Sequence, residues 1–284
     1  MRQLRTIMTA TLLFMTCMAI PSRAHDVDEF DARVVTDKWH VSAGGFLVEF
    51  KTDAQAGFGS FVGTAVRLED DLQVEKDEVT ARLDAFYRWR PRHTFTFGYF
   101  FLERRGSTTL DRRVEFGDRA FDIGGRAKST FSTKIFGAGY RYSLVNTGRS
   151  DAGVMVGLSI NDFGLELEGN AVAVGDTSSV SAEFSGATTQ LLAPVPSLGI
   201  FVDHGLTSRL ILRSSATFLD ITVGDYSGRV VETRFLLEYF FWNDLGVLLG
   251  SSSTDIAIDR RDSRPLKLSY RQSGLTFALS YGGR

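Results

Sequence analysis

The sequence predicts an all-β fold, a transmembrane antiparallel up-and-down β-barrel of about ten strands, with eight or twelve strands as alternatives. Three observations lead to this prediction. The chain begins with an export signal, its strands alternate over unusual lengths, and its connections fall into a short class and a long class. Together they indicate an exported chain that crosses a membrane as a closed sheet.

The first 24 residues have the three parts of a secretory signal. The basic start MRQLR precedes an uncharged apolar run from Ile7 to Ile20, and Ser22 and Ala24 are small residues at the positions that a signal peptidase reads. The apolar run is shorter than the ~20 residues of a transmembrane helix. We therefore expect a signal peptide over residues 1–24 and one barrel domain over residues 25–284.

Composition narrows the function classes. The formal net charge is −2, and the leader is basic, so a nucleic-acid partner is not expected. The only cysteine, Cys17, lies in the leader, so the exported chain has no thiol for catalysis or metal binding, and we expect no cofactor. The longest uncharged stretch downstream, Phe184 to Val202, is interrupted by Pro194 and Pro196. A membrane crossing must then be a closed sheet.

The first strands are the most regular. A first strand is expected within Trp39 to Phe58, and the next over Val79 to Arg90, where twelve residues alternate strictly. That length is typical of a tilted membrane-spanning strand. After a turn at Pro91 and Arg92, the outward face of the third strand is formed by aromatic residues: Phe95, Phe97, Tyr99 and Phe101.

The same pattern recurs to the C-terminus. Alternating apolar residues run over 136–144, 154–160, 231–241 and 275–281. The apolar parity changes near Asn161 and Asp162, after which Phe163, Leu165 and Leu167 form the apolar set. We expect a β-bulge at this change.

Connection lengths set the topology. Short turns are expected at 91–92, 145–152, 204–207 and 242–244, and long polar loops at 69–78, 105–130 and 169–182. Outer-membrane barrels keep short turns on the periplasmic side, which places both termini and all three tryptophans, Trp39, Trp89 and Trp242, at that side. Segment 63–68 either extends a hairpin above the membrane or adds two strands.

The inward faces of these strands carry charges of both signs. The predicted lumen set is Arg82, Asp84, Arg88, Arg141, Arg213, Glu232, Arg234 and Glu238. A salt-bridge network that fills a narrow barrel is the favoured interpretation, because eight strands leave room only for side chains. A charge-lined path or small-ligand site is the alternative.

No catalytic residues are predicted. His40 and Ser42 share one strand face, and their spacing resembles that of outer-membrane lipid A deacylases, but the topology places them at the inner leaflet. Asp203 and His204 are expected to be a turn pair on opposite faces. An omptin-like protease would need a histidine at the outer rim, and no histidine is predicted there.

Arginines in the external connections suggest a surface partner. Arg104, Arg105, Arg112 and Arg113 would suit lipopolysaccharide phosphates, although a solvated charged loop is favoured. The expected partners are outer-membrane lipid, lipopolysaccharide and the barrel assembly machinery, and the chain is expected to be a monomer.

Several local motifs resemble a known family. Residues 67–72 (RLEDDL), 82–88 (RLDAFYR), 139–143 (GYRYS) and 224–226 (GDY) resemble an uncharacterised family of small proteobacterial outer-membrane β-barrel proteins. The resemblance implies location and fold and carries over no active site. The chain departs from such barrels in ending on Gly282, Gly283 and Arg284 after Tyr281, instead of on an aromatic residue.

The sequence thus favours a porin-like integral outer-membrane barrel with a structural or narrow transport or ligand-binding role, and not an enzyme. An outer-membrane lipid hydrolase is one alternative. A secreted soluble barrel that binds an apolar ligand is another, because alternation alone does not say which face is inside. The directions of Arg82 and Leu83 distinguish the membrane barrel from the soluble one.

Overall fold

The computed structural model describes residues 36–57, 63–116, 119–121, 124–173, 182–262 and 265–283. The chain divides into two compact units, Met1–Phe30 and Asp31–Arg284, and all the described residues belong to the second. The predicted signal peptide therefore lies outside the described residues.

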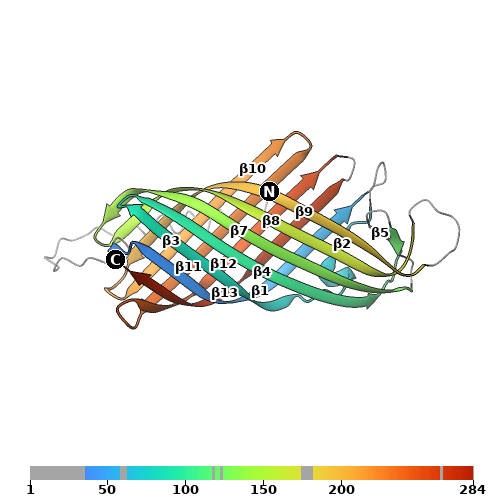
Figure 1. Ribbon diagram of the computed structural model, residues 1–284, viewed down its shortest axis with the longest axis horizontal. Coiled ribbons are helices and arrows are strands. Elements are labelled where there is room, and N and C mark those ends of the chain that lie inside the picture. Colours follow the sequence, from blue (N-terminus) through green and yellow to red (C-terminus); the bar gives the residue numbers. More distant parts are fainter. Residues whose placement is uncertain are drawn as a thin grey trace, which may run out of the picture. The chain divides into compact units, whose positions relative to one another are not determined.

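Ten long strands form a closed antiparallel barrel (Figure 1). They are β1 (Trp39–Ala56), β3 (Asp77–Arg90), β4 (His93–Thr109), β7 (Arg126–Thr147), β8 (Ser150–Ala173), β9 (Ala182–Gly205), β10 (Leu210–Val223), β11 (Tyr226–Phe240), β12 (Leu245–Arg260) and β13 (Leu266–Gly283). Each pairs with its neighbour in the chain, and β1 pairs with β13 to close the wall. The predicted fold class and strand number are confirmed.

Four short elements lie off this cycle. They are β2 (Val66–Arg67), α3 (Leu68–Asp71), β5 (Val114–Phe116) and β6 (Arg119–Phe121). Segment 63–68 adds no strand to the barrel, because β2 pairs only with β1, at Asp53 and Ala54. Among the described residues, no helix has the length and apolar character needed to span a bilayer.

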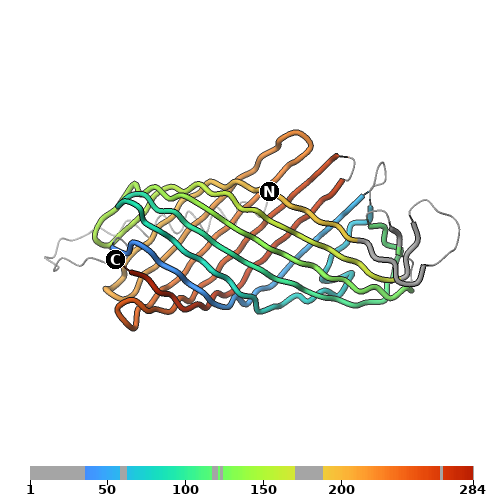
Figure 2. The backbone as a smooth tube through the Cα atoms, in the orientation of Figure 1, coloured from blue at the N-terminus to red at the C-terminus, as the bar shows by residue number. Residues whose placement is uncertain are grey.

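We call the end where β1 meets the C-terminus the terminal end, and the opposite end the far end. At the terminal end Trp39 pairs with Gly283, and Figure 2 shows the C-terminus beside the start of β1. The short turns 91–92, 148–149 and 206–209 lie at this end, together with Trp89 and Trp242. The predicted loop 105–130 is shorter than expected, because β4 continues to Thr109 and β7 begins at Arg126.

In the half nearer the terminal end, apolar side chains point outward. Leu83 is 45% exposed, whereas the side chain of its neighbour Arg82 is 14% exposed and faces the lumen. The same outward band includes Phe97, Phe136, Val156, Leu237 and Phe277, all of them exposed. A barrel with an apolar outside and a charged inside matches the membrane interpretation, not a soluble barrel.

In the half nearer the far end, the polarity is reversed. Most of the exposed outward residues are charged or polar, and Leu192 is an exception; the charged ones include Glu49, Lys51, Asp53, Lys134, Glu166, Glu168, Lys267 and Arg271. The inward residues form a large apolar core that includes Phe50, Phe131, Phe163 and Leu268. This half of the wall therefore has the pattern of a barrel in water.

The reversal corrects the bulge predicted near Asn161. Strand β8 stays in register with β7 through Ile135–Asn161 and Thr133–Phe163, and its inward residues keep one parity throughout. The apolar parity changes because the strand passes from an apolar to an aqueous surrounding, not because a residue is inserted. The register shifts of β8 lie elsewhere, next to Ser143 of β7 and at Gly169.

Candidate functional site in the barrel lumen

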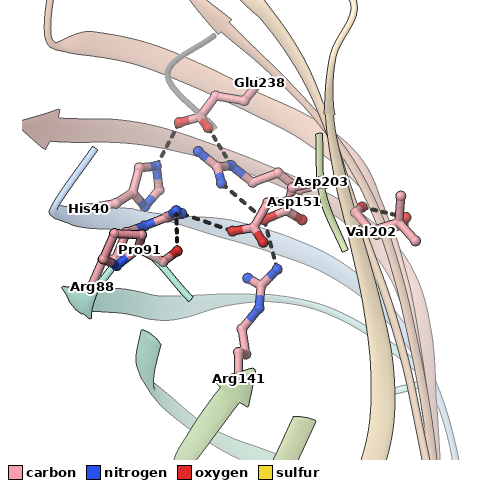
Figure 3. Close-up of polar contacts among 10 residues, drawn as sticks. His40, Arg88, Pro91, Arg141, Asp151, Val202, Asp203 and Glu238 are labelled. Carbon is pink, nitrogen blue, oxygen red and sulfur yellow. Dashed lines mark hydrogen bonds and ion pairs between the residues drawn. The ribbon is translucent and has the colours of Figure 1, made fainter. Parts of the chain in front are cut away.

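A cluster of ion pairs crosses the lumen near the terminal end (Figure 3). His40 Nε2 lies 2.6 Å from Glu238 Oε1, and Arg213 donates to Glu238 Oε2 at 2.6 Å. Arg213 also reaches Asp203 at 3.4 Å, and Arg141 donates to the same carboxylate oxygen at 2.8 Å. Five strands of the wall are joined through these contacts.

A second pair completes this cluster. Arg88 donates to Asp151 at 3.0 Å and to the Pro91 carbonyl at 3.4 Å, and both charged side chains are buried. We call the seven residues the terminal cluster: His40, Arg88, Arg141, Asp151, Asp203, Arg213 and Glu238. Buried charges are tolerated only when paired, so the cluster holds the wall together at this level.

A separate group of charges, the middle cluster, lies further into the lumen: Arg82, Asp84, Glu232 and Arg234. Arg234 donates two hydrogen bonds to Asp84, at 3.1 and 3.0 Å, and Arg82 donates to Asp84 at 2.9 Å. Arg82 also lies 3.7 Å from Glu232. The Arg234–Asp84 pair uses the planar fork of the guanidinium, which is the strongest geometry for such a pair.

A cavity of about 240 Å³ is lined by residues of both clusters. Its wall is rich in small residues, among them Gly98, Gly137, Gly139, Gly157 and Ser197. A Cβ built on Gly137 meets nothing within 4 Å, so the space beside it is open. Gly137 thus leaves room for a small molecule or for water between the charged groups, whereas Gly139 and Gly157 lie close to Thr96 and Ser197.

Beyond the cavity, aromatic rings fill the lumen. We call them the aromatic core: Phe46, Phe50, Phe100, Phe131, Phe163 and Tyr270. Each is at most 4% exposed, and Tyr270 contacts Phe131 and Phe163 with ring centroids at 6.2 and 5.2 Å, while those two rings contact each other at 6.2 Å. The core closes the lumen on the far side of the cavity.

Segment 63–76 is fastened to this core by one buried ion pair. Arg104 is fully buried, donates to Glu69 Oε1 at 2.7 Å, and places its guanidinium 4.2 Å from the Phe50 ring. The other Glu69 oxygen accepts the Thr52 backbone N–H at 2.8 Å. The prediction that Arg104 belongs to an external loop is therefore wrong, because it lies on the inward face of β4.

The other three arginines of the predicted external set form ion pairs on the surface. Arg105 pairs with Glu103, Arg112 with Asp71, and Arg113 with Glu115. Their charges are thus partly neutralised by neighbouring carboxylates, which weakens the case for a phosphate clamp at these positions.

The structure brings all eight sequence-predicted lumen residues into these two clusters. It adds His40, Asp151 and Asp203, which the sequence prediction left out. Asp151 could have been predicted from parity alone. The even residues from 154 to 160 point outward, so the odd residues of β8, including Asp151, face inward. Asp203 lies within β9 instead of in a turn, and it faces the lumen while His204 contacts Ser150.

The three described histidines all lie at the terminal end. His40 and Ser42 are buried and face the lumen, and His40 is engaged with Glu238 and stacks on Phe86 at 5.1 Å. His93 contacts Tyr140, and His204 contacts Ser150. His204 and Ser150 do form a histidine–serine pair on the outward face, but it lies at the terminal end and not at the opposite rim, where the hydrolase alternative requires it.

Similar solved structures are outer-membrane β-barrels. The outer membrane protease OmpT from Escherichia coli has a TM-score of 0.54 and 8% identity, over 86% of this chain and 97% of that chain. The Pseudomonas putida toluene transporter TodX has a TM-score of 0.36 and 10% identity, over 89% and 94%. For the Yersinia pestis protein Ail the values are 0.30 and 7%, over 85% and 99%.

At these identities the likeness concerns the fold alone. No protein-family model matches the chain, and no curated protein matches it. The chain therefore shares its transmembrane β-barrel fold with outer-membrane proteins of Gram-negative bacteria, and its function has to be argued from the lumen.

Proposed function

We propose that this protein is an integral outer-membrane β-barrel, of the proteobacterial kind that its motifs resemble, with a closed lumen and a structural or ligand-binding role without catalysis. The outward apolar band and the OmpT-like fold support the membrane location. Outer-membrane barrels keep their short turns in the periplasm, so the terminal end faces the periplasm. The half of the wall whose outer face is charged then extends outside the cell.

The proposal of a closed lumen is supported by three groups of side chains that obstruct it. The terminal cluster, the middle cluster and the aromatic core follow one another along the barrel, and each links strands that are not neighbours in the wall. A ten-stranded barrel is close to the size at which side chains fill the interior. Solutes therefore have no continuous aqueous path through the described lumen.

Reconstitution tests the proposal. The purified barrel should migrate differently before and after boiling on a denaturing gel, and it should give little steady conductance in planar bilayers. The boiled sample serves as the unfolded control. Recovery as a soluble protein without such a shift would contradict the membrane location, and a large steady conductance would contradict the closed lumen.

The cavity favours a second role, binding of a small anionic solute. Three arginines that line it keep a buried N–H without a partner among the described residues: Arg141 Nε, Arg213 Nη2 and Arg234 Nε. Such groups are available to a carboxylate or phosphate oxygen.

Succinate or phosphate should raise the unfolding temperature of the barrel, and Gly137→Leu, which fills the cavity, should abolish that rise. An equal rise in both proteins would exclude binding in the cavity.

A further inference from the structure

Beyond the apolar band, the barrel wall consists of two separate sheets. Toward the far end, β3 stops pairing with β1 at Asp77 and with β4 at Ala81, and β9 stops pairing with β10 at Leu198. One sheet then comprises β4, β7, β8 and β9, and the other comprises β10, β11, β12, β13 and β1. We call the gap between β1 and β4 the first seam and the gap between β9 and β10 the second seam.

The first seam is filled by the chain itself. The Phe50 N–H of β1 donates to the Lys76 carbonyl at 2.9 Å, and the Glu75 N–H donates to the Arg105 carbonyl of β4 at 3.3 Å. Strand β2 pairs with β1 in the same seam. Segment 63–76 thus provides backbone partners for the edges of both sheets, so this part of the wall is closed by polypeptide.

The second seam has no such filling among the described residues. Residues 188–197 of β9 pair only with β8, and residues 219–223 of β10 pair only with β11. Figures 1 and 2 show the β10–β11 hairpin diverging from β9. Both strands therefore direct one edge into a gap that no described segment occupies.

Strand β9 offers hydrogen bonds to the second seam at its even residues. The Leu206 N–H, just after β9, donates to the Leu210 carbonyl, so even residues of β9 face β10. The register of β9 on β8 is unbroken from residue 204 to residue 185, so the same parity holds along the strand. The even residues that direct both an N–H and a C=O into the seam form what we call the open edge: Thr188, Gln190 and Leu192.

Two prolines delimit the open edge on the side of the apolar band. Pro194 and Pro196 are even residues, so β9 lacks a donor to the second seam at each of them. A continuation of the β9–β10 register would place them opposite Thr222 and Asp220. The carbonyls of β10 would find no donor there, which explains why the pairing stops. At Leu192 the donors of β9 return.

The open edge lacks the features that protect exposed strands from pairing. Charged side chains, prolines and covering segments normally block such edges. The run from Phe184 to Val202 contains no charged residue, and no proline lies between residues 188 and 192. Leu192 is 67% exposed on the outer face, where most of its neighbours are charged or polar. The edge therefore has the properties of a site for strand addition.

Acidic side chains of the outer face lie next to the second seam. Asp162 and Glu166 of β8 pair with residues of the open edge, and Asp220 lies on the edge of β10. None of these three carboxylates forms an ion pair with a described residue. The basic residues opposite two of them, Lys134 and Arg229, lie one strand further from the seam. A strand in the seam is thus favoured when its outward residues are basic.

The inner side of the second seam is apolar. On β9, Leu191 is packed in the apolar core. On β10, Ile221 and Val223 have the inward parity of Ile211, yet they are 40% and 66% exposed because no strand lies beside them. A strand in the seam is thus favoured when its inward residues are apolar, because they would cover these two side chains.

We propose that the second seam is a docking site for an extended segment of another polypeptide, which adds to β9 as an antiparallel strand and alternates basic with apolar residues. The proposal rests on the orientation proposed above, in which this seam lies outside the cell. Residues directly opposite in an antiparallel pair share one face of the sheet. The partner residues that donate to the open edge therefore point outward, so they are the basic ones.

A second copy of this chain fits the seam poorly. Two copies in one membrane direct β9 the same way, from the far end to the terminal end. A symmetric dimer about an axis normal to the membrane would then bring the two strands together without antiparallel pairing. Since strands of such barrels tilt by roughly 35–45° to the axis, the two edges would also cross instead of aligning.

Peptide binding tests this site. The probe is a fluorescent peptide of alternating lysine and valine, blocked at both ends, added to the whole mature protein in phosphatidylcholine nanodiscs, whose lipid carries no net charge. We expect saturable binding by fluorescence anisotropy, with slower hydrogen exchange of residues 188–192. A peptide of alternating glutamate and valine should bind at least about tenfold more weakly. Absence of binding, equal binding of both peptides, or binding without slower exchange would overturn the proposal.

Methylation of the peptide backbone distinguishes strand addition from attraction between charges. Methyl groups on the lysine backbone nitrogens remove the donors that face β9, whereas methyl groups on the valine backbone nitrogens lie on the other edge of the peptide. The two methylated peptides have the same charge. We expect only the valine-methylated peptide to bind, and equal binding of both, or binding of the lysine-methylated peptide alone, would contradict the antiparallel arrangement.

Gln190→Pro removes the central donor of the open edge and leaves the ladder with β8 intact, because the Gln190 N–H points into the seam. Pro194 and Pro196 show that β9 accepts proline at even positions. Gln190→Ser is the matched control, since it also shortens the side chain but keeps the N–H. Binding should weaken by about tenfold or more in the proline variant only. Equal affinity in the two variants would overturn the proposal.

The heat-dependent gel shift and the molecular mass are measured on every sample. A chain that never enters the membrane loses the gel shift, whereas a barrel without this docking site keeps the shift and fails to bind, so the two failures are distinguishable. A wild-type dimer that Gln190→Pro dissociates would assign the seam to a second copy and overturn the proposal.

Discussion

Adjacent residues of one strand occupy opposite surroundings in this protein. Leu83 faces outward and Arg82 faces the lumen, and their strand β3 pairs with β1 through Ala43–Leu83, in the middle of the apolar band. Strand alternation puts every second residue of β3 in contact with lipid. Whether a side chain is apolar or charged therefore depends on whether it faces outward or inward and on its position along the barrel axis.

Leu83→Arg should destabilise the barrel by roughly 2–4 kcal/mol, because it places a charge on the lipid face near the bilayer midplane. Thr188→Arg is the matched control, since Thr188 is exposed on the outward face of β9 opposite Glu166, in the half of the wall whose outer face is charged. Denaturant titrations of refolded barrels in lipid measure both. Equal destabilisation by the two substitutions would show that the apolar band is misplaced.

Glu238→Ala should destabilise the barrel by about 3–5 kcal/mol, because it removes the carboxylate that His40 and Arg213 share and leaves Arg213 buried with only its 3.4 Å contact to Asp203. The control is Asp255→Ala, which removes the partner of Arg271 from an exposed pair and should cost about 0–1 kcal/mol. The same titrations compare the two. Similar values would mean that the terminal cluster is not a structural tie.

His40→Ala should leave host lipids unchanged, because His40 faces the lumen and is held by Glu238. Mass spectrometry of extracted lipid A and phospholipid, from cells that produce the wild-type protein or the variant, is the measurement. A deacylated species that disappears in the variant, while the barrel still folds, would favour the hydrolase alternative.

At the scale of elements, the sequence predicted long regular strands better than their surroundings. The alternation of apolar and polar residues predicted β3, β4 and β13 correctly. In a strand with different surroundings on its two faces, every second residue matches the same surrounding. It misread β8, because the same parity change arises from a bulge and from a change of solvent. The solvent boundary is a property of the whole wall and cannot be read from one strand.

The partners of single charges were also beyond sequence reasoning. Parity identified which charges face the lumen, but pairing depends on heights across the barrel: Arg234 of β11 meets Asp84 of β3 at 150 residues' separation. Arg104 was assigned to a loop because β4 continues beyond the apolar band. Its partner Glu69 lies in segment 63–76, whose path no periodicity predicts.

Segment 63–76 should loosen in acid through Asp71. Burial alone would raise the pKa of Asp71, but the backbone N–H of Arg67 and the charges of Arg112 and Arg67 outweigh it and lower the pKa. A lowered pKa stabilises the folded segment above the unfolded value of about 3.9, and this contribution is lost as the pH falls through the folded pKa.

Hydrogen exchange of residues 63–76 between pH 6 and pH 2, corrected for intrinsic rates, measures this loss. Protection should fall below about pH 3.9 in the wild type, whereas Asp71→Asn should show reduced protection already at pH 6 and a flatter profile. A fall in protection centred above that value would point to another group.

At the scale of the whole molecule, the barrel consists of two halves with opposite polarity, joined at the middle of the strands. The half in the membrane has a charged inside and an apolar outside, and the half beyond it has an apolar inside and a charged outside. The lumen therefore changes from ion pairs to aromatic rings along one continuous wall. Each filling closes the lumen by a different physical means.

Two closures in series make a specific prediction for conductance. Asp84→Ala with Glu238→Ala should open the middle and terminal clusters, and Phe131→Ala with Phe163→Ala should open only the aromatic core, so each double variant should remain closed. Flow through barriers in series is limited by the barrier that remains. The variant with all four substitutions should conduct in planar bilayers more than either double variant, provided that the gel shift shows a folded barrel. Full conductance from one double variant alone would mean that the other filling is no barrier, and the lumen would then have a single gate.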